Sequence, residues 1–329
     1  MGKVKTNVLD FLRKCGFRNP ISYYKEKKNM FLFKKYNKKL SNVDYFEYEK
    51  LLEMPNVVLR APYGCNINYG LCNPVKTLYG GNVDLNYDYI EHGLFYAEAA
   101  PLLIRFLEAI PIGRIFTFSE RRKGQVERVM AKAGFHNEVV ALGPLILGAK
   151  NFHSKEELKE IKKKIGKTLL VFPMHSWTGV DNEFDKDELV QEIERLKSQF
   201  DTIMVCLYYM DIQKGMHKPF KEKGYTIVCN GSRFDMNFIS RHRDIIELSD
   251  VTMSNGIGTH IGYSIALNRP HYYFKQNMEQ TIDPSRPSEI PEQEFRIEFE
   301  KDFVKTFGEF SYEITEKQKQ FVRYYWGEF

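Results

Sequence analysis

The sequence predicts an α/β fold with two Rossmann-like domains that face a central cleft, followed by C-terminal helices. Short apolar runs alternate with helical stretches in two separate series, which is typical of parallel sheets. A charged stretch at 150–166 separates the series. A glycine-containing segment at 250–274 has the pattern of a strand, a tight turn and a helix. We expect units at 1–150 and 151–275, with 276–329 forming a connector and helices that pack back across both.

The composition fits a fold of this size. The chain has 329 residues, 43% hydrophobic and 14% aromatic, which suffices for one large or two medium cores. No apolar run reaches the ~18 residues needed to span a membrane, and the polar N-terminus does not resemble a signal peptide. The five cysteines include no C-x-x-C pair, so neither a zinc site nor a disulfide framework is predicted. A reduced cytoplasmic protein is the expectation.

The first unit is predicted from short patterns. We expect a helix at 6–15, a strand or hairpin near 30–35, a helix near 45–52 and a buried strand at 56–61. A glycine-rich loop at 62–86 follows, and loops of this length are often functional. The remaining elements are strands at 87–90, 115–119 and 139–142 and helices at 98–109 and 124–133.

The second unit shows the alternation more clearly. Strands are expected at 168–172, 202–208, 225–229 and 250–254, and helices at 186–200, 214–223, 235–248 and from 259 onward. About five strand–helix repeats in this length predict a doubly wound sheet. A proline-rich connector at 276–292 precedes terminal helices at 295–307 and 315–326.

The turn within 250–274 is the main candidate site. Its glycines allow a tight turn and a close approach of the backbone to a ligand. The free N–H groups and positive dipole end of the following helix favour a phosphate. The pattern is neither a Walker loop nor a G-x-G-x-x-G motif, and a plain strand-to-helix turn is the alternative. The predicted phosphate contacts are Ser254, Asn255, Gly256, Gly258, Thr259 and His260.

Two other strand ends of the second unit carry polar residues. One motif follows the strand at 168–172, and the other follows the strand at 225–229. A polar, glycine-containing strand end suits ribose or base binding, and an arginine there can bind phosphate through two hydrogen bonds. The predicted nucleotide contacts are His175, Ser176, Asn230, Gly231 and Arg233.

Candidate catalytic residues lie in the first unit. His92 and Glu91 stand just before a glycine at a strand end, where α/β proteins place ligand groups. A histidine of near-neutral pKa suits a general base, and a carboxylate does the same job or orients the histidine. A capping histidine and a solvated charge are the alternatives. At the end of the next strand, Ser119, Glu120 and Arg122 are predicted to line the acceptor side.

The net charge of +5 is uneven. Residues 1–50 mix lysines with aromatic residues, which suggests an anionic membrane surface or a phosphate-bearing partner. A solvated lysine-rich face is the alternative. No nucleic-acid-binding motif is present, so no nucleic-acid partner is expected. No metal-ligand cluster stands out, and a reaction without metal or cofactor is expected.

Four motifs together resemble a GT-B glycosyltransferase of bacterial capsule and surface-polysaccharide assembly. They are EHG at 91–93, FSERRKG at 118–124, VFPMHS at 171–176 and SNGIGTHIGYSIALNRP at 254–270, within 55–275. The last motif is similar to the donor-phosphate loop that such transferases share with UDP-GlcNAc epimerases. The family's glutamates on this helix are absent, because His260 and Ile261 follow Thr259. Donors other than UDP-hexoses therefore stay open.

The resemblance implies metal-independent, inverting transfer of a sugar from a nucleotide-activated donor to a hydroxyl of a surface glycan or glycolipid. In this mechanism the base near His92 or Glu91 accepts the hydroxyl proton, and the helix at Thr259 holds the leaving phosphate. The enzyme would be cytoplasmic, with peripheral membrane contact through residues 1–50. Three alternatives remain: phospho-alcohol transfer from a CDP-activated donor, a sugar-nucleotide epimerase or hydrolase, and a non-enzymatic docking module.

Overall fold

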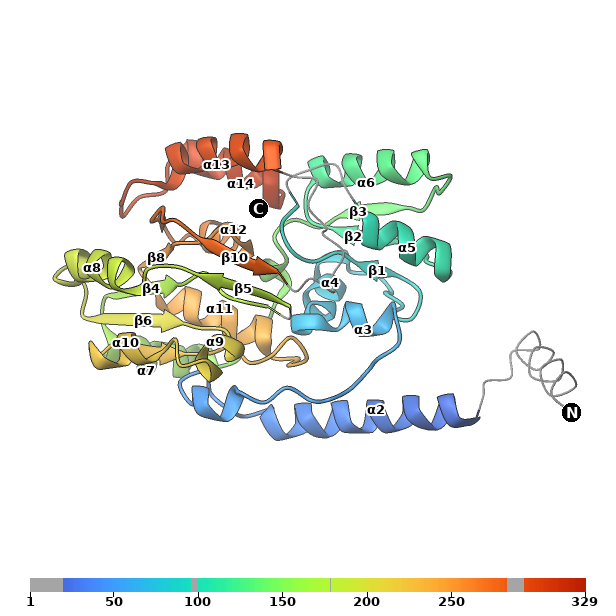
Figure 1. Cartoon of the computed structure of the whole chain (residues 1–329), viewed down its shortest axis with the longest axis horizontal. Helices are drawn as coiled ribbons and strands as arrows, with labels where there is room; N and C mark the ends of the chain where they lie inside the picture. Colours follow the sequence, from blue (N-terminus) through green and yellow to red (C-terminus); the bar gives the residue numbers. More distant parts are fainter. Residues whose placement is uncertain (1–19, 96–99, 178, 283–292) are drawn as a thin grey trace, which may run out of the picture.

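A computed structural model describes residues 20–95, 100–177, 179–282 and 293–329. It confirms the α/β class with two separate parallel sheets (Figure 1). The first sheet holds β1 (Tyr89–Ile90), β2 (Ile115–Thr117) and β3 (Val139–Ala141) in chain order. Two helices connect them: α5 (Pro101–Ala109) and α6 (Glu120–Lys132). All three strands run parallel.

The second sheet has five parallel strands in the order β7-β6-β4-β8-β9. These strands are β4 (Thr168–Phe172), β6 (Thr202–Cys206), β7 (Thr226–Val228), β8 (Val251–Ser254) and β9 (His271–Tyr273). Every residue of β4 is buried because both faces of the sheet are covered, which explains its continuous apolar run. The accompanying helices are α7 (Lys155–Ile165), α8 (Lys186–Lys197), α9 (Tyr209–Gln213), α10 (Lys218–Glu222), α11 (Phe238–Leu248) and α12 (Thr259–Ala266).

Several predictions about local structure were wrong. The predicted strand at 30–35 lies inside helix α2 (Pro20–Leu40), which buries Phe33, Tyr36 and Leu40 at helical spacing. Residues 56–61 form no strand, and Val58 is 79% exposed. The predicted helix at 45–52 is only the turn η1 (Tyr48–Leu51). The predicted loop at 62–86 contains α3 (Tyr63–Asn66), η2 (Asn68–Gly70) and α4 (Cys72–Tyr79). The predicted helix at 6–15 lies outside the described residues.

Two short strands were not expected. β5 (Val180–Glu183) pairs antiparallel with β10 (Glu279–Ile282), so part of the predicted connector extends the second unit as a ribbon. A 3-10 turn, η3 (Leu145–Gly148), leads from the first sheet toward α7. Among the described residues, no helix combines the length and apolar character needed to cross a bilayer.

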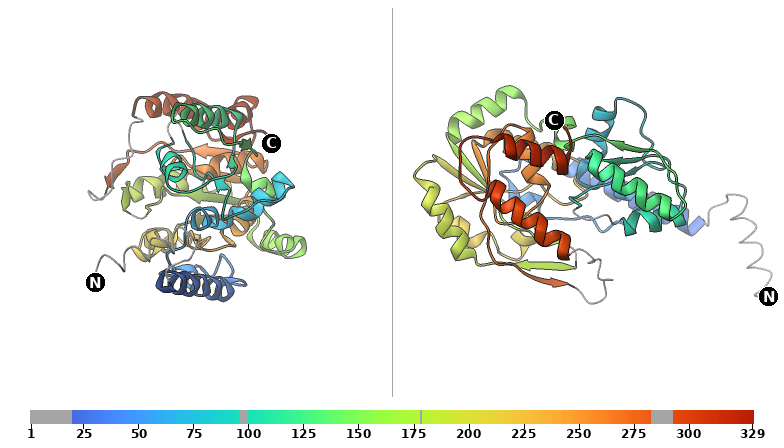
Figure 2. Two further views of the ribbon diagram at one scale, coloured as in Figure 1. Left: turned by 90° about the vertical axis from the view of Figure 1, so that its right-hand side faces the viewer. Right: turned by 90° about the horizontal axis from the view of Figure 1, so that it is seen from above.

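The N-terminal basic segment packs on the second sheet's side. Tyr36 forms a side-chain hydrogen bond with Ser232 (2.9 Å), and the Cys229 N–H donates to the Tyr45 carbonyl (3.1 Å). The sequence prediction placed this segment with the first unit, at 1–150. Helix α2 lies along the side of the molecule opposite the C-terminal helices (Figures 1 and 2).

The C-terminal helices α13 (Gln293–Phe307) and α14 (Glu316–Trp326) connect both halves. α14 contacts α12 of the second unit and α6 of the first. The Trp326 indole lies directly on Gly262, where any Cβ would overlap it. Just beyond, Gly327 packs against the backbone of Phe118 and Gly143, at the ends of β2 and β3. Helix α14 and the residue that follows it therefore join the two halves.

Candidate functional site

The carboxyl ends of the first sheet's strands meet helix α12 of the second unit at one pocket. The first unit contributes Glu91, His92 and Phe118 and the second contributes Thr259 and Tyr263, while Leu71, Gly93, Pro144, Leu145 and Trp326 complete the lining. The pocket is small, with a cavity volume of about 20 Å³, and it is partly open to solvent. A parallel sheet presents ligand-binding groups at this edge, so the pocket lies where an α/β fold places a site.

The second sheet has a topological switch point beside this pocket. Counted along the chain, its strands run 3-2-1-4-5, so connections leave β4 and β8 in opposite directions. The loop after β4 begins at Pro173, and the loop after β8 begins at Asn255. The two loops are joined, because the Met174 N–H donates to the Asn255 side-chain oxygen (2.7 Å). In open α/β sheets, ligands bind in the crevice at this point.

Helix α12 begins at the same place. Its N-cap is Gly258, no side chain caps it, and its first turn holds no acidic residue. Gly256 is needed because a Cβ there would overlap the Met174 sulfur. The helix therefore presents its first N–H groups and positive dipole end without a competing carboxylate, which suits an anion.

Glu91 is held by a buried ion pair. Its carboxylate accepts from Arg122 Nη2 (2.5 Å) and Nε (3.0 and 3.1 Å), and from the Thr117 hydroxyl (2.8 Å). Both Glu91 and Arg122 are almost fully buried. Both oxygens of this carboxylate are occupied by the guanidinium and the hydroxyl, so the side chain is not free to contact a substrate hydroxyl. Its geometry suits a group that fixes the end of β1.

His92 follows directly and lines the pocket. Burial lowers its pKa below the usual 6.5, although the charge of Glu91 opposes the shift. Its Nδ1 is a buried nitrogen without a hydrogen-bond partner at normal geometry. The ring packs edge-on against Tyr69, with centroids 6.1 Å apart. His92 is thus a neutral imidazole at physiological pH, the form that a general base requires.

Further histidines lie within and beside the second sheet. His260 stacks on Phe172 (4.8 Å between centroids) and lies 5.8 Å from His271. Burial and the neighbouring imidazoles hold the pKa of His260 well below its usual range. His175 is exposed, yet enough protein surrounds it for desolvation to lower its pKa to about 4.

Arg233 brings positive charge toward the first unit. Burial is the main cause of the lowered pKa of His92, and the positive charge of Arg233 adds to the lowering. The guanidinium therefore lies near that imidazole. Its Nε is buried without a hydrogen-bond partner. The Arg233 carbonyl accepts from the Tyr69 N–H (2.6 Å), which joins this loop to the first unit. An arginine with unused donors beside the crevice is suited to a phosphate or carboxylate.

Several predicted contact residues serve internal roles instead. The Ser254 hydroxyl bonds to the Gly256 carbonyl (2.9 Å) and His271 (3.0 Å). Asn255 also donates to the Gln276 side chain (2.7 Å). Ser176 accepts from the Asn182 N–H (3.2 Å), and its own N–H donates to Asp211 (3.2 Å). All of these serines and asparagines are buried, so they shape the loops rather than offering side chains to a ligand.

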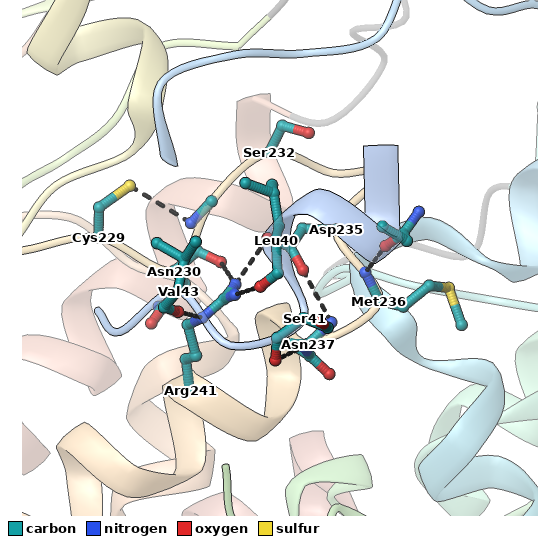
Figure 3. Close-up of polar contacts among 12 residues, drawn as sticks. Leu40, Ser41, Val43, Cys229, Asn230, Ser232, Asp235, Met236, Asn237 and Arg241 are labelled. Atoms are coloured by element: carbon teal, nitrogen blue, oxygen red, sulfur yellow. Dashed lines mark hydrogen bonds and ion pairs between the residues drawn. The ribbon is translucent and has the colours of Figure 1, made fainter. Parts of the chain in front are cut away.

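Asn230 belongs to a buried network that fastens helix α2 (Figure 3), and the neighbouring Gly231 N–H donates to the Cys229 sulfur (3.3 Å). Arg241 donates to the carbonyls of Leu40, Val43 and Asn230 and forms an ion pair with Asp235 (2.6 Å). Gly231 has a φ of 94°, and a Cβ there would crowd the Asp235 carboxylate. The structure therefore gives these two predicted nucleotide contacts a structural position.

The predicted acceptor-side residues are similarly occupied. Ser119 is the N-cap of α6 and accepts from the Arg122 N–H (3.1 Å). Arg122 pairs with Glu91, and its guanidinium lies 4.1 Å from the Phe95 ring centroid. Glu120 is exposed and lies 3.7 Å from Lys123. None of these three contacts identifies an acceptor subsite.

Sequence patterns missed Tyr69, Tyr263 and Trp326. Tyr69 has a φ of 58°, unusual for a tyrosine, and sits between His92 and Phe238. Tyr263 and Trp326 line the pocket, and Trp326 Nε1 is buried without a hydrogen-bond partner. Nothing in the sequence around Gly262 of α12 indicated that an indole covers this glycine.

Within the part of the chain that the structure describes, no group of three or more His, Cys, Asp or Glu side chains is placed to hold a metal ion.

Comparison with known proteins gives distant structural likenesses. No family model matches the chain, and no curated protein matches it. Among solved structures, the chain is similar to the UDP-GlcNAc 2-epimerase of Methanocaldococcus jannaschii, solved with UDP-GlcNAc and UDP. The two share 13% identity with a TM-score of 0.36, over 71% of this chain and 72% of that one.

A second similar structure is Anabaena HepE in complex with UDP and glucose. The identity is 12% and the TM-score is 0.32, over 57% of this chain and 53% of that one. The match thus spans about half of the HepE chain. Likenesses at this level are too distant to carry an activity over to this chain.

Proposed function

We propose that this protein is a glycosyltransferase that uses a nucleotide-activated sugar as donor. The observation that carries the proposal is the pocket itself, where the uncapped start of α12 and the neutral His92 come from opposite sheets to one space. Transfer between two bound substrates needs both an anion site for the leaving group and a proton acceptor for the nucleophile.

On the second sheet's side, the proposed roles concern the donor. The N–H groups at Thr259 and His260 hold the leaving phosphate, because the helix dipole stabilises the negative charge that develops there. Arg233 supports the same charge from across the crevice. The nucleotide lies along the switch point between the loops after β4 and β8, beside His175. Gly256 and Gly258 keep the backbone close to the ligand.

On the first sheet's side, His92 acts as the general base. An acceptor hydroxyl attacks the anomeric carbon, a carbon–oxygen bond forms, and the bond from that carbon to the leaving phosphate breaks with inversion. The proton of the hydroxyl passes to the His92 imidazole. Glu91 is a positioning residue in this proposal, since its ion pair with Arg122 fixes the backbone that carries His92. Metal-independent transfer to a bacterial surface glycan or glycolipid remains part of the proposal.

The first experiment measures thermal unfolding with UDP, CMP, CDP, GDP and their sugars. A ligand at about 100 times its Kd adds roughly 2.7 kcal/mol to the free energy of unfolding. Absence of stabilisation by every nucleotide would reject the donor site and favour a non-enzymatic docking module. A nucleotide that binds then defines the donor for turnover assays.

The second experiment tests the roles in turnover. His92→Ala is expected to lower kcat by about 10²–10⁴-fold, because the step loses its general base. Thr259→Ala, which removes the side-chain hydroxyl at the start of α12, is expected to lower turnover, and Glu127→Ala, at an exposed position of α6, is the control. Full activity of His92→Ala would reject its role. Donor consumption without acceptor would indicate an epimerase or hydrolase, and a product joined through phosphorus would indicate phospho-alcohol transfer.

A further inference from the structure

Helix α2 has a solvent face of unusual chemistry. Its two most exposed aromatic side chains are Tyr24, which is 70% exposed, and Phe31, which is 65% exposed, while the neighbouring Tyr23 is 48% exposed. Tyr24 and Phe31 lie seven residues apart, about two helical turns, and therefore on one line along the helix. Exposed lysines flank this line on both sides, namely Lys27, Lys28, Lys34, Lys35 and Lys38. We call these seven side chains the lysine-aromatic face.

The opposite face of α2 is fixed to the body of the protein. Phe33, Tyr36 and Leu40 are buried there. The Asn37 side chain donates to the Phe234 carbonyl (3.1 Å) and accepts from the Met236 N–H (2.8 Å). The helix therefore cannot bury its aromatic line by rolling over, and the lysine-aromatic face stays turned outward.

A second lysine-rich helix shows what an ordinary solvated surface of this protein looks like. Helix α7 carries Lys163 and Lys164 near its end, but glutamates alternate with its lysines, and Lys163 pairs with Glu160 (2.6 Å). By contrast, the acidic residue of α2, Glu26, is partly buried and lies outside the lysine-aromatic face. The combination on α2 thus differs from the chain's general richness in lysine.

We propose that the lysine-aromatic face docks the protein on an anionic lipid bilayer. Aromatic rings are favoured at the boundary between headgroups and acyl chains, where Tyr24 and Phe31 would insert. Lysines beside them are attracted to lipid phosphates, and their aliphatic stems cover apolar surface while the charges reach the headgroups. Nucleic acid would also attract lysines, but a line of aromatics between two rows of lysines on a rigid helix matches a planar surface better than a strand of phosphates. This inference is independent of the proposed transferase activity.

Cosedimentation of the full-length chain with vesicles tests the proposal. We expect binding to phosphatidylcholine vesicles that contain about 30% phosphatidylglycerol, weaker binding in high salt, and little binding to pure phosphatidylcholine. Lys34→Gln with Lys35→Gln is expected to weaken partitioning at least about tenfold, because each lysine near an anionic surface contributes a several-fold factor. Its matched control is Lys163→Gln with Lys164→Gln on α7, which should leave partitioning unchanged.

The aromatic contribution is tested separately. Phe31→Ser is expected to weaken partitioning several-fold with little change in thermal unfolding, since the side chain is already exposed. The control is Leu102→Ser, which removes an exposed apolar side chain of α5. Absence of wild-type binding to the anionic vesicles would overturn the proposal. Equal losses in the α2 and α7 variants would overturn it too, as would binding of a single-stranded RNA through the same lysines without vesicle binding.

Discussion

The two sheets have different strand orders, but each has a buried arginine–carboxylate ion pair near its carboxyl edge. Each edge carries a fully buried arginine paired with a carboxylate, Arg122 with Glu91 in the first unit and Arg241 with Asp235 in the second. The first sheet's strands follow chain order, whereas the second reverses direction between β4 and β8. Only a reversal opens a crevice within a sheet. The second unit is therefore suited to hold a ligand, and the first to face it.

This difference changes what each ion pair does. Glu91 and Arg122 stiffen the strand end that carries His92, so the pair lies next to a proposed catalytic residue. Asp235 instead pairs with Arg241, whose guanidinium donates to the carbonyls of Leu40 and Val43 at the end of α2 and just beyond it (Figure 3). The same chemistry thus supports a site in one unit and a segment junction in the other.

The largest expected effect comes from breaking either pair. Glu91→Gln and Asp235→Asn should each lower the free energy of unfolding by roughly 3–5 kcal/mol, because each leaves a buried guanidinium without its carboxylate. Urea unfolding followed by circular dichroism measures the loss. If the comparison holds, Glu91→Gln also lowers turnover beyond the loss of folded protein, while Asp235→Asn leaves turnover per folded molecule unchanged. Equal effects on turnover would remove the distinction between the pairs.

A pH-dependent link is expected on the second unit's side. His153 bonds to Asp244 of α11 and to Asp44 (both 2.9 Å), and these bonds raise its pKa from 6.5 to about 9. Because the folded-state pKa is raised, the stabilisation is complete below pH 6.5 and is lost as pH rises through about 9. The shift corresponds to roughly 3–4 kcal/mol. Unfolding at several pH values should show this slope in the wild type, and His153→Gln should flatten it. An unchanged slope in the variant would contradict the assignment.

The smallest expected effect compares two helix glycines. Gly262 of α12 lies beneath Trp326, so Gly262→Ala should destabilise the protein by about 1–3 kcal/mol through overpacking. Gly124 of α6 has only the end of the flexible Arg128 side chain nearby, so Gly124→Ala should stabilise by about 0.5–1 kcal/mol through helix propensity. Thermal unfolding of the two variants gives the signs. Destabilisation by Gly124→Ala would show that α6 packs more tightly than its contacts indicate.

Sequence patterns predicted the second sheet well for a physical reason. Strands buried on both faces, such as β4, carry continuous apolar runs that local reading detects. Helix α2 was missed because lysines interrupt its aromatics at short intervals, and only the docked partners show that Phe33, Tyr36 and Leu40 form one face. Whether an aromatic is buried there depends on a loop almost 200 residues away, near Ser232.

The candidate site was predictable only in outline. The turn before α12 was visible because Gly256 and Thr259 mark a tight turn and a helix start. Its side chains were not assignable, since the partners that occupy Ser254 and Asn255 are His271, Met174 and Gln276, from separate elements. Trp326 was invisible for the same reason, because a residue near the end of the sequence covers α12 only in three dimensions.

Helix α14 is fastened to both halves, with Trp326 on Gly262 and Gly327 against Phe118 and Gly143. The two units joined in this way cannot move apart independently. Any hinge motion between them must break the contacts of this helix with one of the two units. Opening of the pocket is then coupled to the packing of a single tryptophan, because that indole must leave Gly262 before the two halves can separate.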